Sequence, residues 1–348
     1  MSLIFNKNCF KVSAIALFLL FFQLAQAQSF ADPTLQFERS GKDFGNHAIL
    51  AIIQPGKPVF LKPMGEMTAK DQAPLGSISQ WLTTALVLSY VDAGKISLDD
   101  KVSQYIPIFT KYAKGYITIR DCLTHFSGIE ADQIKMSSFE TNTKFASLQE
   151  EVESYATKRE IKANPATEFW YSQVGLNMAA RVLEVITRRG FEQLMGEKIT
   201  RPLLMRSTSF SSFGAVNPSG GAVGSANDLS NFITMILNKG MFNGKRILSE
   251  ASVQEMQKVR TSPSLIKYAP AQAAGLAYSM GAWVTSTNTE GVATALDCPG
   301  LCGSWAGIDW CRNYGFIVLT RKMENTEKSD AYKRIRKALD DQLPATCN

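Results

Sequence analysis

The stretch that decides the fold is "APLGSISQWLTTALVLSYVDAGKISLDDKVSQYIP", residues 73–107. Between Ser77 and Ala93, apolar residues recur at helical spacing, and Gly94 follows where such a helix is expected to end. The spacing therefore predicts a helix that begins at a serine. A serine in this place lies beside backbone N–H groups and the positive end of the helix dipole, which together can hold an oxyanion.

The first 27 residues are typical of a signal peptide. Lys7 and Lys11 precede an apolar run over 12–24, and the A-x-A sequence that ends at Ala27 is typical of a cleavage site. We therefore expect export to the periplasm or the medium after cleavage near Ala27. The apolar run is too short for a comfortable transmembrane helix, and no later stretch approaches twenty apolar residues, so no stable membrane span is expected.

The net charge of the chain does not indicate a strongly basic binding surface. The formal net charge is +6, and loss of the two leader lysines leaves 35 basic against 31 acidic side chains. So small an excess, without basic blocks, argues against nucleic acid as a partner and against an anionic membrane surface. The sequence does not indicate an oligomeric state.

Five cysteines follow the expected cleavage site, and export favours disulfides between them. Their odd number leaves at least one unpaired within a monomer. The spacing leaves the pairing open: Cys298 with Cys302 would close a tight loop, and Cys302 with Cys311 is a second choice. Zinc is the rival interpretation, but neither His47 nor His125 stands at ligand spacing from a cysteine pair. We expect no metal and no cofactor.

Strand patterns stand at both ends of the chain, and helical patterns fill the middle. A hairpin is predicted over 47–66 with its turn at 55–57, and a final helix is predicted over 329–343. Four strand-like stretches precede that helix, namely "GLAYSMGAWVT", "GVATAL", "GSWAGIDW" and "YGFIVLTRKM". This order predicts an α/β protein of the α+β type, with one antiparallel sheet built from both chain ends, flanked by helices, and an inserted helical lobe.

Neither repeats nor low-complexity linkers divide the chain. We therefore expect a single domain over 28–348. Within it, the sheet lobe is expected over about 35–76 and 270–348, and the mainly helical lobe over about 77–269.

Several extended segments carry a family resemblance. They are "GSISQWLTTALVLSYVDAGKISLDDKVSQYIP", "YITIRDCLTHFSGI", "FWYSQVGLNMAARVLEVITRRGFEQLM", "RPLLMRSTSF" and "GGAVGSANDLSNFITMILNKGMFNGKRILSEASVQEM". In order and spacing the chain resembles the serine β-lactamase-related superfamily, which includes class C β-lactamases, DD-peptidase penicillin-binding proteins and related esterases. The resemblance implies a β-lactamase/transpeptidase-like fold and acyl transfer through a serine.

Each of the three short motifs of that superfamily is altered here. The S-x-x-K motif corresponds to Ser77 to Gln80, the Y-x-N motif to Tyr171 to Gln173, and the K-T-G or H-x-G motif to Cys298 to Gly300, with Cys302 to Ser304 as a second choice. The resemblance implies catalytic roles for Ser77 and Tyr171 and substrate-binding roles for Gly300 and Ser304. Gln80, Gln173 and Cys298 occupy positions where the family has other residues.

The substitutions remove the groups that would deprotonate the serine. Gln80 forms hydrogen bonds but does not titrate near neutral pH. The Tyr171 phenol has an ordinary pKa near 10, so only about one in a thousand is ionised at pH 7 without a nearby cation. Loss of a general base typically slows a reaction by about 10²- to 10⁴-fold, which reactive esters, thioesters and strained lactams tolerate better than peptide amides.

Two functional hypotheses follow. In the first, the protein is a serine hydrolase or acyltransferase with slow or altered chemistry, in which Ser77 attacks and Tyr171 relays the proton. In the second, it is an inactive relative that binds a small-molecule or cell-wall-derived acyl ligand in a regulatory role. If Ser77 is considered without the family resemblance, its simplest role is that of an N-cap residue of the helix. His125 is expected to be a buried structural histidine rather than a substitute base.

Overall fold

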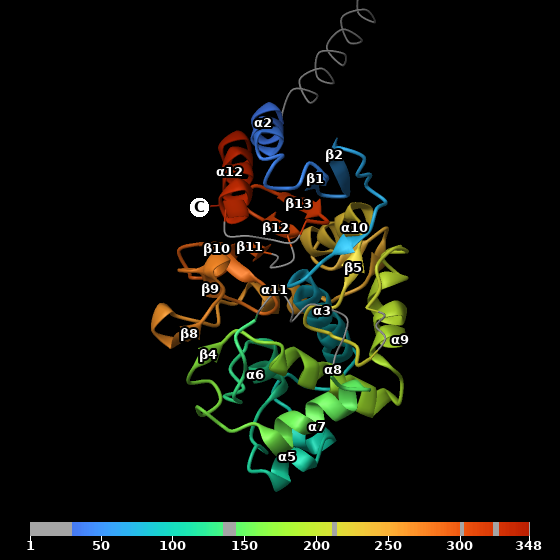
Figure 1. The fold of residues 1–348 in the computed structure, drawn as a ribbon, viewed down its shortest axis with the longest axis vertical. Helices are drawn as coiled ribbons and strands as arrows, with labels where there is room; N and C mark the ends of the chain where they lie inside the picture. Colours follow the sequence, from blue (N-terminus) through green and yellow to red (C-terminus); the bar gives the residue numbers. More distant parts are fainter. Residues whose placement is uncertain (1–29, 135–143, 211–213, 300–302, 323–326, 348) are drawn as a thin grey trace, which may run out of the picture.

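The strands from both ends of the chain form one seven-stranded sheet in the computed structural model (Figure 1), in the order β2-β1-β13-β12-β11-β10-β9. The structure describes residues 30–134, 144–210, 214–299, 303–322 and 327–347. All neighbouring strands are antiparallel, so the predicted fold class is confirmed. The strands are β1 (Ala48–Gln54), β2 (Lys57–Met64), β9 (Ala277–Tyr278), β10 (Trp283–Thr287), β11 (Ala293–Pro299), β12 (Trp305–Asp309) and β13 (Tyr314–Thr320).

The two chain ends meet at β1. This strand pairs with β2 on one side, as the predicted hairpin, and with β13 on the other, where Ala48 lies opposite Thr320. Its sequence "AILAII" is apolar at every position because both faces of the strand are covered. Leu50 packs into the smaller core on one face of the sheet, and its neighbour Ile49 packs into the main core on the other.

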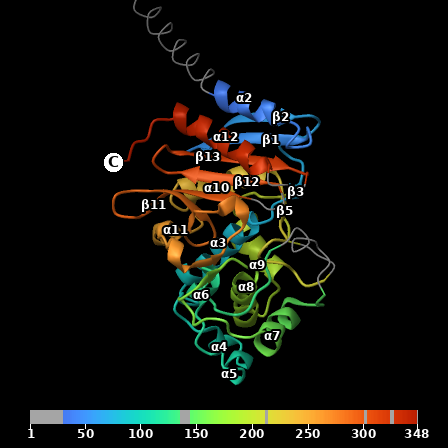
Figure 2. The same cartoon turned by 60° about the vertical axis from the view of Figure 1, so that its left-hand side comes forward.

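Helices provide this cover. α2 (Ala31–Arg39) and α12 (Glu327–Gln342) lie side by side on one face of the sheet (Figures 1 and 2), where Phe37 and Tyr332 belong to the smaller core. α10 (Ala226–Leu237) packs against β1 and β13 on the opposite face. No helix in the described ranges is both long enough and apolar enough to cross a bilayer.

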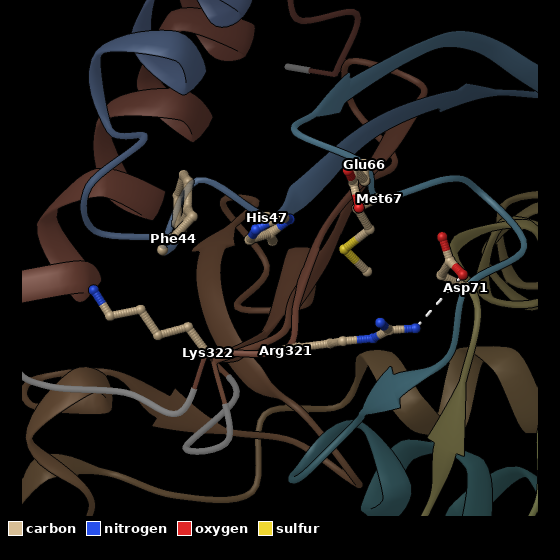
Figure 3. Close-up of a pocket in the computed structure, with 8 residues that line it drawn as sticks. Phe44, His47, Glu66, Met67, Asp71, Arg321 and Lys322 are labelled. Atoms are coloured by element: carbon tan, nitrogen blue, oxygen red, sulfur yellow. Dashed lines mark hydrogen bonds and ion pairs between the residues drawn. The ribbon is translucent and has the colours of Figure 1, made fainter.

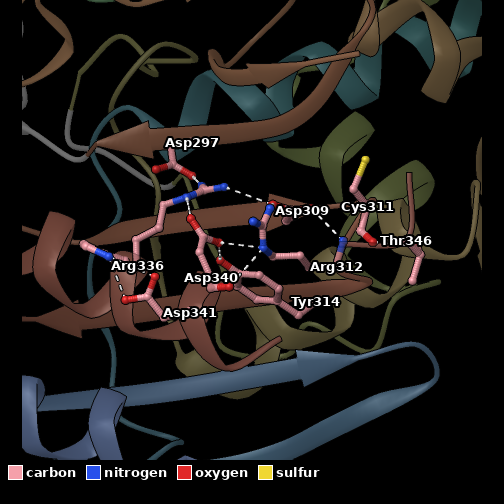
Figure 4. Close-up of polar contacts among 10 residues, drawn as sticks. Asp297, Asp309, Cys311, Arg312, Tyr314, Arg336, Asp340, Asp341 and Thr346 are labelled. Carbon is pink, nitrogen blue, oxygen red and sulfur yellow. Dashed lines mark hydrogen bonds and ion pairs between the residues drawn. The ribbon is translucent and has the colours of Figure 1, made fainter. Parts of the chain in front are cut away.

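A buried charge network joins α12 to the sheet (Figure 4). The Arg336 guanidinium forms an ion pair with Asp297 of β11 and lies 3.6 Å from both Asp309 of β12 and Asp340 of its own helix. Burial raises the pKa of Asp297 to about 6, against the opposing effect of Arg336. Because a buried charge is costly without its partner, the network fixes α12 relative to the end of β11.

The disulfide in the described chain joins Cys311 to Cys347. Next to it, Thr346 donates to the Cys311 carbonyl from its N–H at 2.7 Å and from its hydroxyl at 2.6 Å, so the C-terminal tail is tied to the β12–β13 turn. Of the two pairings left open, Cys298 with Cys302 is contradicted, because Cys298 is a buried free thiol whose side chain packs in the main core. Cys302 itself lies outside the described residues. The second choice, Cys302 with Cys311, fails because Cys311 is already paired.

The central helix is α3 (Ile78–Asp92), which confirms the helix predicted from the opening stretch. Ser77 is its N-cap residue, and Gly94 adopts a positive φ of 63° just beyond its end. Residues 78–90 of this helix are all buried, because sheet elements and the helical lobe surround it. The other helices of the inserted segment are α4 (Val102–Tyr105), α5 (Ile108–Lys111), α6 (Ile119–Leu123), α7 (Leu148–Lys158), α8 (Val174–Thr187), α9 (Phe191–Met195) and α11 (Glu250–Gln257).

Candidate active site

Ser77 does not act as a simple helix cap. The first three amides of α3 donate to carbonyls three residues before them, at 3.1, 2.9 and 3.0 Å, and the Ser77 side chain accepts from none of them. A capping serine would accept one of these N–H groups. The three amides are already used, which leaves the N–H of Ser77 itself as the candidate oxyanion donor at this helix start.

Hydrogen bonds connect Ser77 to the groups around it. The Ser77 hydroxyl donates to the Pro299 carbonyl, at the end of β11, at 2.7 Å. The Tyr171 phenol lies close enough to the side chains of Ser77 and Trp283 for hydrogen bonding from both to lower its pKa. An indole N–H can only donate, so Tyr171 is the acceptor toward Trp283. The second motif therefore lies beside the nucleophile position.

The surroundings keep Tyr171 protonated. Burial raises the pKa of its phenol far above the ordinary value, a charge on Cys298 would raise it further, and the hydrogen bonds from Ser77 and Trp283 lower it only in part. Burial also raises the pKa of the Cys298 thiol, which stays neutral. In the described ranges, neither a lysine nor an arginine is among the groups that shift the pKa of Tyr171. A phenol without a nearby cation remains a poor base at neutral pH.

Gln80 turns its side-chain oxygen toward His125 and Tyr278. Gln80 Oε1 lies 3.1 Å from His125 Nε2 and accepts from the Tyr278 hydroxyl at 3.2 Å. His125 Nδ1 accepts the backbone N–H of Ser172 at 3.3 Å, so the neutral ring carries its proton on Nε2. Gln80 Oε1 and the Tyr278 hydroxyl both lie 3.1 Å from this nitrogen. A Gln80 NH₂ group turned toward Nε2 would face another donor, so the amide oxygen points toward His125 and the NH₂ group away from it.

His125 does not replace the missing base. Burial lowers the pKa of its imidazole to about 3, so the ring is neutral at physiological pH. Both ring nitrogens take part in hydrogen bonds, and the ring lies 4.6 Å from that of Tyr171 and 4.9 Å from that of Tyr278. The expected structural role of this histidine is confirmed. Its contact with the Tyr171 ring brings the second motif next to Gln80 of the first.

Two other predicted positions have separate roles. Gln173 is the N-cap residue of α8, where its carbonyl accepts from the Ser219 hydroxyl at 2.9 Å, and it borders a small cavity of about 90 Å³. Ser304 is fully buried, and its hydroxyl donates to the Pro74 carbonyl at 2.7 Å. This hydrogen bond joins the start of β12 to the segment before Ser77, and the substrate-binding role of Ser304 stays a prediction. Gly300 lies outside the described residues.

A separate cavity of about 620 Å³ opens where β1 begins and where β2 and β13 end (Figure 3). Its charged lining comes from His47, Glu66, Asp71, Arg321 and Lys322. Arg321 donates to the Gln72 carbonyl at 3.0 Å and lies 3.5 Å from the Asp71 carboxylate, so it holds the segment that leads to Ser77. The cavity is lined by none of the predicted motif residues, and we assign it no catalytic role.

A protein-family comparison covers most of the chain. Residues 47–340 match the family model described as Beta-lactamase. Among curated proteins, the chain is 25% identical over 174 residues to Protein flp of Staphylococcus aureus strain MW2, which covers 47% of the chain and 34% of that protein. It is 25% identical over 139 residues to the D-alanyl-D-alanine-carboxypeptidase/endopeptidase AmpH of Escherichia coli strain K12, covering 39% and 36% respectively. The matched part is about a third of the length of these relatives.

Solved structures share the architecture. EstCE1, described as a hydrolase with promiscuous acyltransferase activity, superposes with a TM-score of 0.75 at 17% identity, over 91% of this chain and 99% of that one. The octameric penicillin-binding protein homologue of Pyrococcus abyssi gives 0.70 at 18% identity, over 90% and 78%. At these identities the similarity shows a common fold.

Proposed function

Because the chain belongs to the beta-lactamase family over residues 47–340, we propose that it is a serine hydrolase or acyltransferase that reacts slowly through Ser77. The observation that carries the proposal is the contact of Ser77, at the start of α3, with the Tyr171 phenol. The substrate class is an ester, a thioester or a strained lactam, because these acyl groups need the least help from a general base.

The proton path accounts for the slow rate. During acylation, Ser77 Oγ forms a bond to the acyl carbon, the leaving group departs with its electron pair, and the hydroxyl proton passes by way of Tyr171 to the leaving group. Ser77 must first give up its hydrogen bond to Pro299, and the Tyr171 phenol, whose pKa is raised by burial, is protonated and so does not readily accept the proton. A neutral phenol and a glutamine supply little driving force for these steps.

The direct test is covalent labelling of the intact protein. A fluorophosphonate probe and p-nitrophenyl butyrate should each add one adduct, located on Ser77 by peptide mass spectrometry, with slow release of the butyryl group. Ser77→Ala should abolish the adduct, and Tyr171→Phe should slow its formation. A folded wild-type protein that gains no adduct over hours would exclude this chemistry.

A second function is favoured by the engaged hydroxyl of Ser77. Because Ser77 donates to Pro299 and the buried Tyr171 phenol stays protonated, the described site lacks a poised nucleophile. The protein would then hold a small-molecule or cell-wall-derived acyl ligand without turnover. In that case Ser77→Ala should leave binding of the ester probes, measured by calorimetry, within about twofold of the wild-type value, with no label on the native protein.

We also propose that the protein is exported, as its first 27 residues suggest. The Cys311–Cys347 disulfide supports this assignment, because disulfides persist mainly in oxidising compartments. N-terminal sequencing of the protein from cells should give a mature chain that begins at Gln28. A chain that keeps residue 1 and remains in the cytosol would contradict the proposal.

A further inference from the structure

The side-chain nitrogen of Gln80 is a buried donor that has no partner among the described residues. The side chain is fully buried, and its oxygen lies 3.1 Å from His125 Nε2 and accepts from the Tyr278 hydroxyl at 3.2 Å, which directs the NH₂ group away from both residues. Buried donors in native proteins are nearly always met by protein, water or ligand atoms. An acceptor from outside the chain is therefore expected at this nitrogen.

Gln80 shares a helix face with the nucleophile position. Ser77 precedes it by three residues and Thr84 follows it by four, which places all three along one side of α3. The Thr84 hydroxyl is also buried without a described partner, and a Cβ on Gly281 would stand 2.7 Å from it. The Cys298 thiol donates to the Gly281 carbonyl at 3.5 Å. The Thr84 hydroxyl, which with the Gln80 nitrogen and Trp81 Nε1 is one of the three buried polar atoms of α3 without a described partner, thus lies on the side of the helix that meets the third motif.

The described groups on this side are all neutral. Gln80 does not titrate, burial lowers the pKa of His125 to about 3, and burial raises the pKa values of Tyr171 and Cys298. A carboxylate brought here would lose its hydration without gaining an opposite charge. An uncharged carbonyl oxygen asks only for a hydrogen-bond donor, and the Gln80 amide supplies one.

We propose that Gln80 determines specificity: its amide N–H binds an uncharged acceptor, so the site takes neutral acyl ligands, esters or thioesters, in preference to ligands that place a carboxylate beside Ser77. His125 and Tyr278 are positioning residues that hold the amide in this orientation. The inference rests on the proposed function, since it names the substrate class of that site.

A matched pair of esters tests the preference. p-Nitrophenyl butyrate and mono-p-nitrophenyl succinate carry the same leaving group and similar chain lengths, but the second ends in a carboxylate. The wild-type protein should be acylated at Ser77 at least about tenfold faster by the butyrate, a ratio that corresponds to about 1.4 kcal/mol. Equal rates, or faster acylation by the succinate, would overturn the proposal.

Two variants separate a role in recognition from a structural role. Gln80→Met keeps the length of the side chain but removes its hydrogen-bond donor. It should reduce the preference for the butyrate ester over the succinate ester to less than about threefold, and it should slow acylation by the butyrate ester. Gln149→Met, the same substitution on the exposed face of α7, should keep both rates within about twofold of wild type. A Gln80→Met protein that is folded by circular dichroism and keeps the full preference would also refute the assignment.

The experiment distinguishes failure of Ser77 acylation from failure of the role proposed for Gln80. If neither ester acylates Ser77, calorimetric binding of the two esters to the unreacted protein still measures the preference. Tighter binding of the butyrate, lost in Gln80→Met, would support the role of Gln80 although catalysis fails. Equal binding of both esters would reject it.

Discussion

The hydroxyl of Ser77 donates a hydrogen bond at 2.7 Å to the carbonyl of Pro299, which lies 222 residues further along the chain. This bond connects the start of the central helix to the end of a sheet strand. It also uses the only proton of the predicted nucleophile. The resting site is therefore stabilised by the same atom that would have to react.

Removal of that atom should cost stability as well as labelling. Ser77→Ala removes the hydroxyl that donates to the Pro299 carbonyl in a buried place, and it also removes one of the two side chains that interact with the Tyr171 phenol. We expect the free energy of unfolding to fall by about 1–3 kcal/mol. Urea denaturation of wild type and variant measures this. An unchanged midpoint would show that the Ser77–Pro299 bond does not form in solution.

Gln80→Lys should not restore efficient lactam hydrolysis. The new ammonium would enter a buried space beside neutral His125 and Tyr278, and the third motif would still carry Cys298. We expect nitrocefin turnover within about tenfold of wild type and a loss of several kcal/mol of stability at pH 7. Gln80→Met is the uncharged control of similar length. A turnover raised by a thousandfold would contradict this account.

The pH dependence of that loss has a definite sign. Burial lowers the pKa of a lysine, so the folded variant binds fewer protons than the unfolded chain above the folded pKa. Its unfolding free energy should therefore rise with pH toward about 10, the ordinary lysine value, and the deficit against Gln80→Met should shrink between pH 7 and pH 9.

His125 should make the protein sensitive to acid. Its pKa is lowered from 6.5 to about 3 by burial, so the unfolded chain binds a proton in this range while the folded protein does not. The stability it contributes is complete above pH 6.5 and declines as the pH falls toward 3, by up to about 4–5 kcal/mol. Denaturation from pH 4 to pH 8 should show a smaller slope in His125→Asn than in the His47→Gln control. Identical slopes in the two variants would count against a buried neutral His125.

The Cys311–Cys347 disulfide should stabilise the sheet lobe. It closes a separation of 36 residues, and disulfides of this kind typically contribute about 2–4 kcal/mol. Cys347→Ser should lose that amount in urea denaturation. Dithiothreitol should bring wild type to the level of the variant and leave the variant unchanged. Peptide mapping without reduction should yield the Cys311–Cys347 peptide, and a peptide that joins Cys298 to another cysteine would overturn the described pairing.

Arg336→Met should expose the cost of the buried Asp297 carboxylate. Removal of one partner of a buried ion pair typically costs about 3–5 kcal/mol. Because burial already raises the pKa of Asp297 to about 6, acid should protonate it and recover part of the loss. We expect a smaller deficit at pH 5 than at pH 8. The double variant Asp297→Asn, Arg336→Met should recover stability at both pH values, which separates charge burial from lost packing.

The architecture could be predicted because its signals are local and repeated. The helical spacing after Ser77 and the terminal strand patterns each follow from neighbours in the sequence, and each is present in the structure. α2 could not be predicted with the same ease, because only Pro33 and Phe37 of its nine residues are buried and the apolar pattern is weak.

The contacts within the site depend on residues that are far apart in sequence. Gln80 meets His125 at a separation of 45 residues and Tyr278 at a separation of 198, and no spacing rule connects them. The substituted motif positions could be identified from the sequence, but the direction of each hydrogen bond could not. The cysteine pairing failed for a similar reason, since closeness in sequence says nothing about which way the Cys298 side chain points.

The pairing of β1 with β13 has a consequence for how the molecule is made. The hairpin of β1 and β2 can form early, but an isolated two-stranded hairpin is only marginally stable. The other neighbour of β1 is β13, at residues 314–320, which follows only after the whole helical segment has been synthesised. The sheet that presents the Pro299 carbonyl to Ser77 can therefore be completed only after β13 has been made, so a truncation before residue 314 should leave an unfolded product rather than a partly active one.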